Sequence, residues 1–188
     1  GLLGPLLDLG NEVDLLLFSH QGELMDQLDE RVNLLPEQAV LSHLKTPVTE
    51  AFKDRHLRLG ITRIAVKLKA LLRRKTGKAS NQLAYLSRYM QPLVDDIPGS
   101  YDVALSFQAP HDLVLKHVDA RLKIGWVHTD YTRERLDIDF ERHTWTELDR
   151  IATVSGSVRD SFVTVFPELE EMMFVAENCF DPLLVQEQ

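Results

Sequence analysis

The chain has only one cysteine, Cys179, so it cannot form an internal disulfide. A disulfide framework is therefore excluded, and a reducing compartment is favoured. The chain also lacks an apolar run long enough to cross a bilayer. Its opening GLLGPLLDLG has no preceding basic residues and no small-residue cleavage site, which argues against a signal peptide. We therefore expect a cytoplasmic protein.

Several catalytic motifs are also missing. The sequence contains no G-x-S-x-G elbow, no P-loop and no G-x-G-x-x-G, so hydrolase, ATPase and simple dehydrogenase functions lose their usual sequence support. The positions of His111, His128 and Asp130 do not follow the spacing of a zinc motif. Candidate functional residues must therefore be identified from their positions relative to the predicted strands.

The 188 residues, 44% hydrophobic and 27% charged, suit one soluble domain. Apolar β-type segments occupy residues 13–19, 31–36, 101–108, 120–128, 149–155 and 172–178. Most are continuous, as in parallel strands that are covered on both faces. Helical patterns lie between many of them, at 47–74, 79–91, 139–148 and 156–166. We predict an α/β fold with a Rossmann-like, doubly wound and mostly parallel sheet in three layers. PGS at 98–100 predicts a turn before a strand.

The net charge is −8, but the segment 53–78 holds ten basic residues and one acidic residue. It falls largely within the long amphipathic helix predicted at 47–74. That helix either packs on the sheet with a solvated basic face or lies on an anionic membrane. Nucleic acid is a weaker alternative, since no aromatic residue interleaves the basic ones. The candidate membrane-docking residues are Arg63, Lys67, Lys69, Arg73 and Arg74.

Polar side chains follow the predicted strands, where ligands bind in open parallel sheets. The candidates are Gln108 and His111 after one strand, His128, Asp130 and Tyr131 after the next, and Ser155 after a third. Each has a structural alternative. Asp130 and Ser155 are good helix N-caps, His111 lies near a helix start, and a backbone carbonyl can satisfy His128.

Three segments together resemble the N-terminal domain of GT-B-fold glycosyltransferases, and most closely the family-four (group 1) enzymes. They are YDVALSFQAPHDLVLKHVDARLKIGWVHTDYTRERLD, DRIATVSGSVRDSFVTVFPEL and VAENCFDP. VDLLLFSHQGELMDQLDERVNLLPE is similar to the second and third strands of that domain. The resemblance implies that residues 1–178 are an N-terminal Rossmann-like domain and that 179–188 begin an interdomain linker. It further implies a fragment whose first strand is missing from the sheet. Either the neighbouring strands close up or another segment fills the place.

The resemblance implies the acceptor-binding half of a hexosyltransferase. The full enzyme would move a sugar from a nucleotide-diphosphate donor to a saccharide or lipid-linked acceptor, with retention, in polysaccharide or glycolipid biosynthesis. A C-terminal domain would hold most of the donor, and no metal, covalent cofactor or nucleic acid is expected. His128 and Asp130 would be catalytic. Gln108, His111, Tyr131 and Ser155 would bind the acceptor. This half alone would be inactive.

A lipid-linked acceptor would place the protein at the inner face of the plasma membrane as a peripheral protein. Two other functions stay open. In the first, the chain is a non-catalytic Rossmann-like module that docks to a membrane or protein partner. In the second, it is half of a sugar-nucleotide epimerase.

Overall fold

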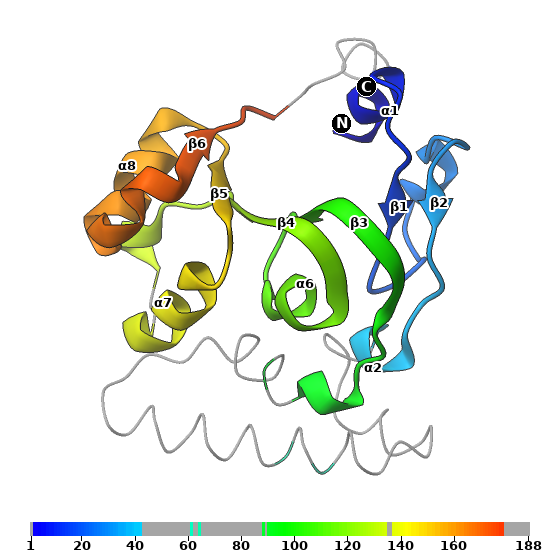
Figure 1. The fold of residues 1–188 in the computed structure, drawn as a ribbon, viewed down its shortest axis with the longest axis horizontal. Coiled ribbons are helices and arrows are strands. Elements are labelled where there is room, and N and C mark those ends of the chain that lie inside the picture. Colours follow the sequence, from blue (N-terminus) through cyan, green and yellow to red (C-terminus); the bar gives the residue numbers. More distant parts are fainter. Residues whose placement is uncertain are drawn as a thin grey trace.

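The computed structural model describes residues 2–42, 61, 64, 88, 90–134 and 137–178. Its strands form two parallel sheets, one of two strands and one of four (Figure 1). The strands are β1 (Asp14–Leu15), β2 (Asn33–Leu34), β3 (Ile97–Ser106), β4 (Val118–Val127), β5 (Arg150–Thr153) and β6 (Met173–Val175). Each of the six predicted segments contains or overlaps one of them. The predicted α/β fold with mostly parallel strands is confirmed.

Helices alternate with strands along the described chain. The α-helices are α1 (Leu3–Asp8), α2 (Ala39–Ser42), α6 (Asp112–His117), α7 (Ile138–Thr146) and α8 (Gly156–Val165). The 3-10 helices are η1 (Met25–Gln27), η2 (Gln91–Leu93), η3 (Tyr131–Arg133) and η4 (Pro167–Met172). The helices predicted at 139–148 and 156–166 are confirmed as α7 and α8. The prediction at 47–74, and most of that at 79–91, concern residues outside the described ones.

The four-stranded sheet has the order β3-β4-β5-β6, and α6, α7 and α8 lie in the connections between its strands. This is the βαβ pattern of a parallel sheet. Side chains alternate between its faces, so Ile151 and Ala152 point in opposite directions. The larger cluster, on the α7 and α8 side, comprises Val127, Trp145, Leu148, Ile151, Phe162, Phe166 and Leu169. A smaller cluster on the other face comprises Ile124, Trp126 and Ala152, with Leu2 against it.

The residues Pro98, Gly99 and Ser100 lie inside β3 instead of forming a turn before it. The prediction of a turn at 98–100 was therefore wrong. The pairing register of β3 with β4 shifts between Ile97 and Tyr101, and Gly99 has a φ of 101°. Glycine accepts this conformation without steric cost, so here it marks an irregularity within a strand.

The strands β1 and β3 belong to separate sheets, although they lie side by side in Figure 1. The phenol of Tyr101 in β3 donates a hydrogen bond to Asp14 Oδ2 in β1, at 2.7 Å. Leu16 and Phe18, just after β1, pack against a third cluster, to which α6 contributes buried Leu113. Among the described residues, the two sheets are therefore connected through side chains and not through a backbone ladder. For the first strand that the resemblance implies to be missing, the two predicted outcomes were closure of its neighbours or replacement by another segment. Among the described residues, β1 and β3 do not pair, so closure is not observed.

Gly125 of β4 lies where a larger residue would collide with α7 and the turn after it. A Cβ added there would be 2.6 Å from Leu148 Cδ1 and 2.8 Å from Trp145 Cζ3. We expect Gly125→Ala to lower the free energy of unfolding by about 1–3 kcal/mol, because an overpacked core must shift. Urea unfolding measures the loss.

The matched control is Gly156→Ala at the start of α8, where an added Cβ would have no neighbour within 4 Å. This substitution should change stability by less than about 0.5 kcal/mol. Equal effects of the two substitutions would contradict the tight packing of α7 on β4.

Candidate functional site

The carboxyl ends of β3, β4 and β5 lie next to one another at one rim of the parallel sheet. Ser106 at the end of β3 is level with Gly125 of β4, and Val127 at the end of β4 is level with Thr153 of β5. The loops that follow carry the predicted site residues. The structure therefore places Gln108, His111, His128, Asp130 and Ser155 along the rim where ligands of parallel sheets bind.

His128 is half-buried at the end of β4 and is held by Phe107. Its Nε2 lies 2.6 Å from the Phe107 carbonyl oxygen. Because a carbonyl only accepts, Nε2 carries a proton, and Nδ1 of the neutral ring is then an acceptor. The rings of Phe107 and His128 meet edge to face at 4.5 Å, and the Trp126 ring is nearly parallel to His128 at 6.2 Å. These contacts fix the direction of the imidazole.

The hydrogen bond that orients His128 is thus accepted by the backbone carbonyl of Phe107. Phe107 was not among the predicted residues, although the sequence carried a signal for it: an apolar residue directly after a strand. Its ring is 43% exposed, so it shields one side of His128 while it still faces solvent.

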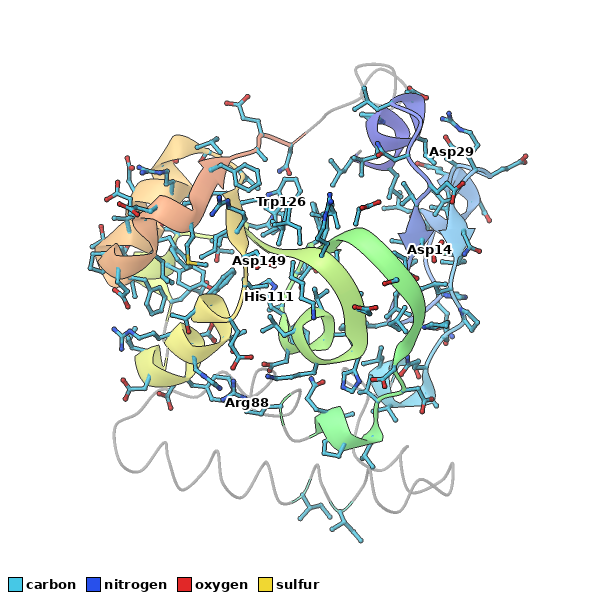
Figure 2. The ribbon with its side chains drawn as sticks, in the orientation of Figure 1. Asp14, Asp29, Arg88, His111, Trp126 and Asp149 are labelled. Carbon is cyan, nitrogen blue, oxygen red and sulfur yellow. The ribbon has the colours of Figure 1, made fainter. Side chains whose placement is uncertain are left out.

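His111 is buried on the other face of the sheet from Trp126, as Figure 2 shows. Its Nδ1 lies 2.8 Å from the Ser106 hydroxyl, and its ring packs on Trp145 at 4.4 Å. Burial lowers the pKa of His111 to about 4, and nearby His128 lowers it further when its own ring is protonated. At neutral pH His111 is therefore an uncharged imidazole that links the end of β3 to the core.

Asp130 caps η3. Its Oδ1 accepts from the Thr132 backbone N–H at 3.0 Å and from the Thr132 hydroxyl at 2.6 Å. The Thr132 hydroxyl is the main cause of a lowered pKa for Asp130. Arg133 Nε lies 3.2 Å from its other oxygen. The capping alternative for Asp130 is confirmed, and both its oxygens already have partners.

Ser155 caps α8 in the same way. Its hydroxyl accepts from the Val158 N–H at 3.3 Å and lies 2.9 Å from the Ser157 hydroxyl. The sequence alternative for Ser155, an N-cap, is therefore confirmed. A cap residue can still meet a ligand, so acceptor binding by Ser155 stays a prediction.

Tyr131 points into the core. Its ring centroid lies 4.7 Å from that of Phe162, and 6.1 Å from those of Trp145 and Phe166. Burial raises the pKa of its phenol well above the ordinary value. Its packing explains this residue without a ligand, so the predicted acceptor contact gains no support from its surroundings. By contrast, Gln108 is exposed at the rim.

A buried polar group that the sequence did not reveal lies behind His111. Glu141 Oε2 accepts from Trp145 Nε1 at 3.3 Å, and Arg88 Nη2 lies 3.6 Å from Asp112 Oδ1. Burial, with a smaller effect of Asp112, raises the pKa of Glu141 to about 7. Burial also raises the pKa of Asp112. These residues come from α6, α7 and position 88, so no local sequence pattern could have linked them.

Among the residues described, no group of three or more His, Cys, Asp or Glu side chains could hold a metal ion. No helix in the described ranges is long and apolar enough to span a membrane. The predicted membrane-docking residues lie outside those ranges: Arg63, Lys67, Lys69, Arg73 and Arg74. The predicted linker, 179–188, is outside them too. Comparisons of the chain with protein-family models, curated proteins and solved structures found no match.

The N-cap of α8 has a measurable energetic consequence. We expect Ser155→Ala to lower the free energy of unfolding by about 1 kcal/mol, because the Val158 N–H loses its acceptor. Ser155→Asp should retain most of the stability, since Asp is an equally good cap. Urea unfolding provides the measurement. Ser157→Ala removes the neighbouring hydroxyl and is the control; an equally large loss there would rule out a cap-specific effect.

Glu141 should make stability depend on pH. Its pKa is about 7 in the folded chain against an ordinary value of 4.5, so folding favours the protonated form. The contribution of Glu141 to the free energy of unfolding is therefore full below pH 4.5, and it is lost as the pH rises through 7. The difference between the two pKa values corresponds to about 3 kcal/mol in the free energy of unfolding. We expect Glu141→Gln to remove this decline when unfolding is followed from pH 4.5 to 8.

The control for Glu141 is Glu171→Gln, which removes an exposed carboxylate of η4 and measures the background effect of one lost charge. The comparison is the difference in stability between each variant and the original chain at each pH. A constant difference for Glu141→Gln across this range would show that its carboxyl does not titrate with folding.

Proposed function

We propose that this chain is the acceptor-binding side of a GT-B-type hexosyltransferase that moves a sugar from a nucleotide-diphosphate donor to a saccharide or lipid-linked acceptor. The observation that carries the proposal is the rim of the sheet. Two adjacent strand ends, those of β3 and β4, present an oriented, half-buried His128 and an exposed Gln108, with buried His111 behind. This is a polar site of hydrogen-bonding groups, as hydroxyl-rich ligands require.

The sequence segments that carry the family resemblance support the same assignment. IGWVHTDY spans the end of β4 and the start of η3, and IATVSGSVRD spans β5 and the first half of α8. Both segments thus cross the rim. The resemblance rests on residues that form the candidate site as well as on residues that form the core.

In the proposed reaction, the bond between the anomeric carbon and the donor diphosphate breaks, and a bond to the acceptor oxygen forms on the same face. The acceptor hydroxyl passes its proton to an oxygen of the departing diphosphate as it attacks, so the step balances without a further base. His128 Nδ1, an acceptor with no hydrogen-bond partner among the described residues, would hold a hydroxyl near the reacting carbon. Positioning of this kind accounts for a large part of the catalytic effect.

Most of the donor contacts would come from a C-terminal domain, so catalysis needs more than the present residues. No metal or covalent cofactor is required by the proposal. With a lipid-linked acceptor, the basic segment containing Arg63, Lys67 and Lys69 would dock on the anionic inner face of the plasma membrane. Asp130 and Ser155 would then shape the site mainly through the caps that they form.

Saccharide binding by the 188-residue protein tests the proposal. The probes are glucose, galactose, mannose, N-acetylglucosamine and their disaccharides, titrated while the imidazole signals are followed by NMR. We expect at least one probe to bind with a Kd of about 1–10 mM, as for a site with few contacts. His128→Ala should weaken binding at least tenfold, because the ring supplies the central acceptor.

The matched control is His143→Ala, which removes an exposed histidine of α7 away from the rim. It should leave the saccharide titration unchanged. If no probe moves the His128 signals, or if both variants bind equally well, the acceptor-binding assignment is wrong, and a non-catalytic module becomes the better hypothesis. An epimerase half would instead bind a nucleotide sugar in preference to every free saccharide.

A further inference from the structure

Phe107 lies at the rim of the sheet next to two aromatic side chains from β4 and its end. Ser106 of β3 is level with Gly125 of β4, so the next residue along each strand places Phe107 beside Trp126. The centroids of these two rings are 5.2 Å apart, and the interplanar angle is 62°. Phe107 meets His128 at 4.5 Å with the same angle. We call Phe107, Trp126 and His128 the aromatic corner.

The phenyl ring of Phe107 faces solvent, although two neighbouring rings hold it in place. Phe107 is 43% exposed, whereas Trp126 is only 7% exposed. A mobile side chain loses conformational entropy when a ligand covers it, but a ring that its neighbours already restrain loses less. Phe107 is therefore a preorganised apolar surface at the edge of the candidate site.

Two nitrogen atoms of the aromatic corner have unused hydrogen-bonding capacity. Trp126 Nε1 is buried and has no hydrogen-bond partner among the residues that the structure describes. Such a group is uncommon in native proteins, and an ordered water or a ligand is one way in which it is satisfied. His128 Nε2 is bonded to the Phe107 carbonyl, which leaves Nδ1 of the neutral ring as an acceptor. An exposed apolar ring thus lies beside polar groups that can still form hydrogen bonds.

This combination matches one side of a pyranose ring. The C–H groups of a pyranose gather on one face and make it apolar, while its hydroxyl groups both donate and accept hydrogen bonds. The face of an aromatic ring carries partial negative charge, which attracts C–H groups. The three side chains include no carboxylate, lysine or arginine, so the corner suits a neutral sugar better than a charged one.

We propose that the acceptor saccharide stacks its C–H face on the ring of Phe107 while one of its hydroxyl groups donates to His128 Nδ1. The ligand class is a neutral pyranoside with an apolar face. Phe107 is then a binding residue that selects the sugar, in addition to shielding His128. This inference rests on the proposed acceptor-binding function, and it adds the ring on which the acceptor lies.

Saturation-transfer NMR on the 188-residue protein tests the stacking, with the saccharide probes named above. Irradiation of the aromatic protons should saturate the C–H protons on one face of the bound sugar more strongly than those on the other. The two tryptophans of the chain serve as reporters. The indole proton of Trp126 should shift during the titration, because its ring is 5.2 Å from Phe107. That of Trp145, in the cluster on the other face of the sheet, should not shift.

Substitutions at Phe107 separate the effect of its ring from that of its backbone. The carbonyl that orients His128 is retained in every variant at this position. Phe107→Leu keeps an apolar side chain without a flat ring and should weaken saccharide binding about fivefold. Phe107→Trp keeps an aromatic face and should bind at least as well as the original chain. The matched control is Phe174→Leu on β6, the opposite edge strand, where Phe174 is 40% exposed; it should leave binding unchanged.

The outcomes distinguish this inference from the proposed function. Equal effects of the two leucine variants, or equal saturation of both faces of the sugar, would overturn the stacking on Phe107. The acceptor-binding proposal would still stand if His128→Ala weakened the same titration. If no saccharide binds, both are wrong. Should Phe107→Leu fail to fold, Phe107→Trp and the saturation pattern of the original chain still decide the question.

Discussion

The packing of Trp145 against β4 is the contact on which the rest of the structure depends. Trp145 is fully buried, and it lies so close to Gly125 that the strand has no room for a Cβ at that point. Its ring touches His111 on one side and Phe162 on another, and its indole N–H donates to Glu141. One side chain thus ties α7 and α8 to the sheet and anchors the loop that carries His111 to the rim.

The same burial explains the opposite pKa shifts around Trp145. Removal of water disfavours any charge, so the pKa of the base His111 decreases and that of the acid Glu141 increases. Both groups are therefore biased towards their neutral forms. At the rim, a half-buried His128 and a capped Asp130 keep contact with solvent. Within a few residues of the strand ends, the ionisable groups therefore change from buried and biased towards neutrality to partly exposed and polar.

Much of the fold could be predicted because its signals are local. Continuous apolar runs marked all six strands, and Asp130 and Ser155 were recognised as potential caps from residue type and position. The prediction was wrong for residues 98–100, because a glycine with positive φ occurs in an irregular strand as well as in a turn. For Tyr131, position after a strand suggested the rim, but η3 directs its ring towards Phe162. Whether a side chain points inwards depends on partners distant in sequence.

By itself, the sequence determined the α/β class, the approximate strand positions and the set of polar residues that follow the strands, since each depends on neighbours within a few positions. Only the tertiary structure decided that a backbone carbonyl orients His128, that Glu141 and Arg88 lie in the buried region behind His111, and that β1 and β3 face each other without pairing. These features join residues from separate elements. Their energies depend on burial and on hydrogen-bond geometry, neither of which exists until the chain has folded.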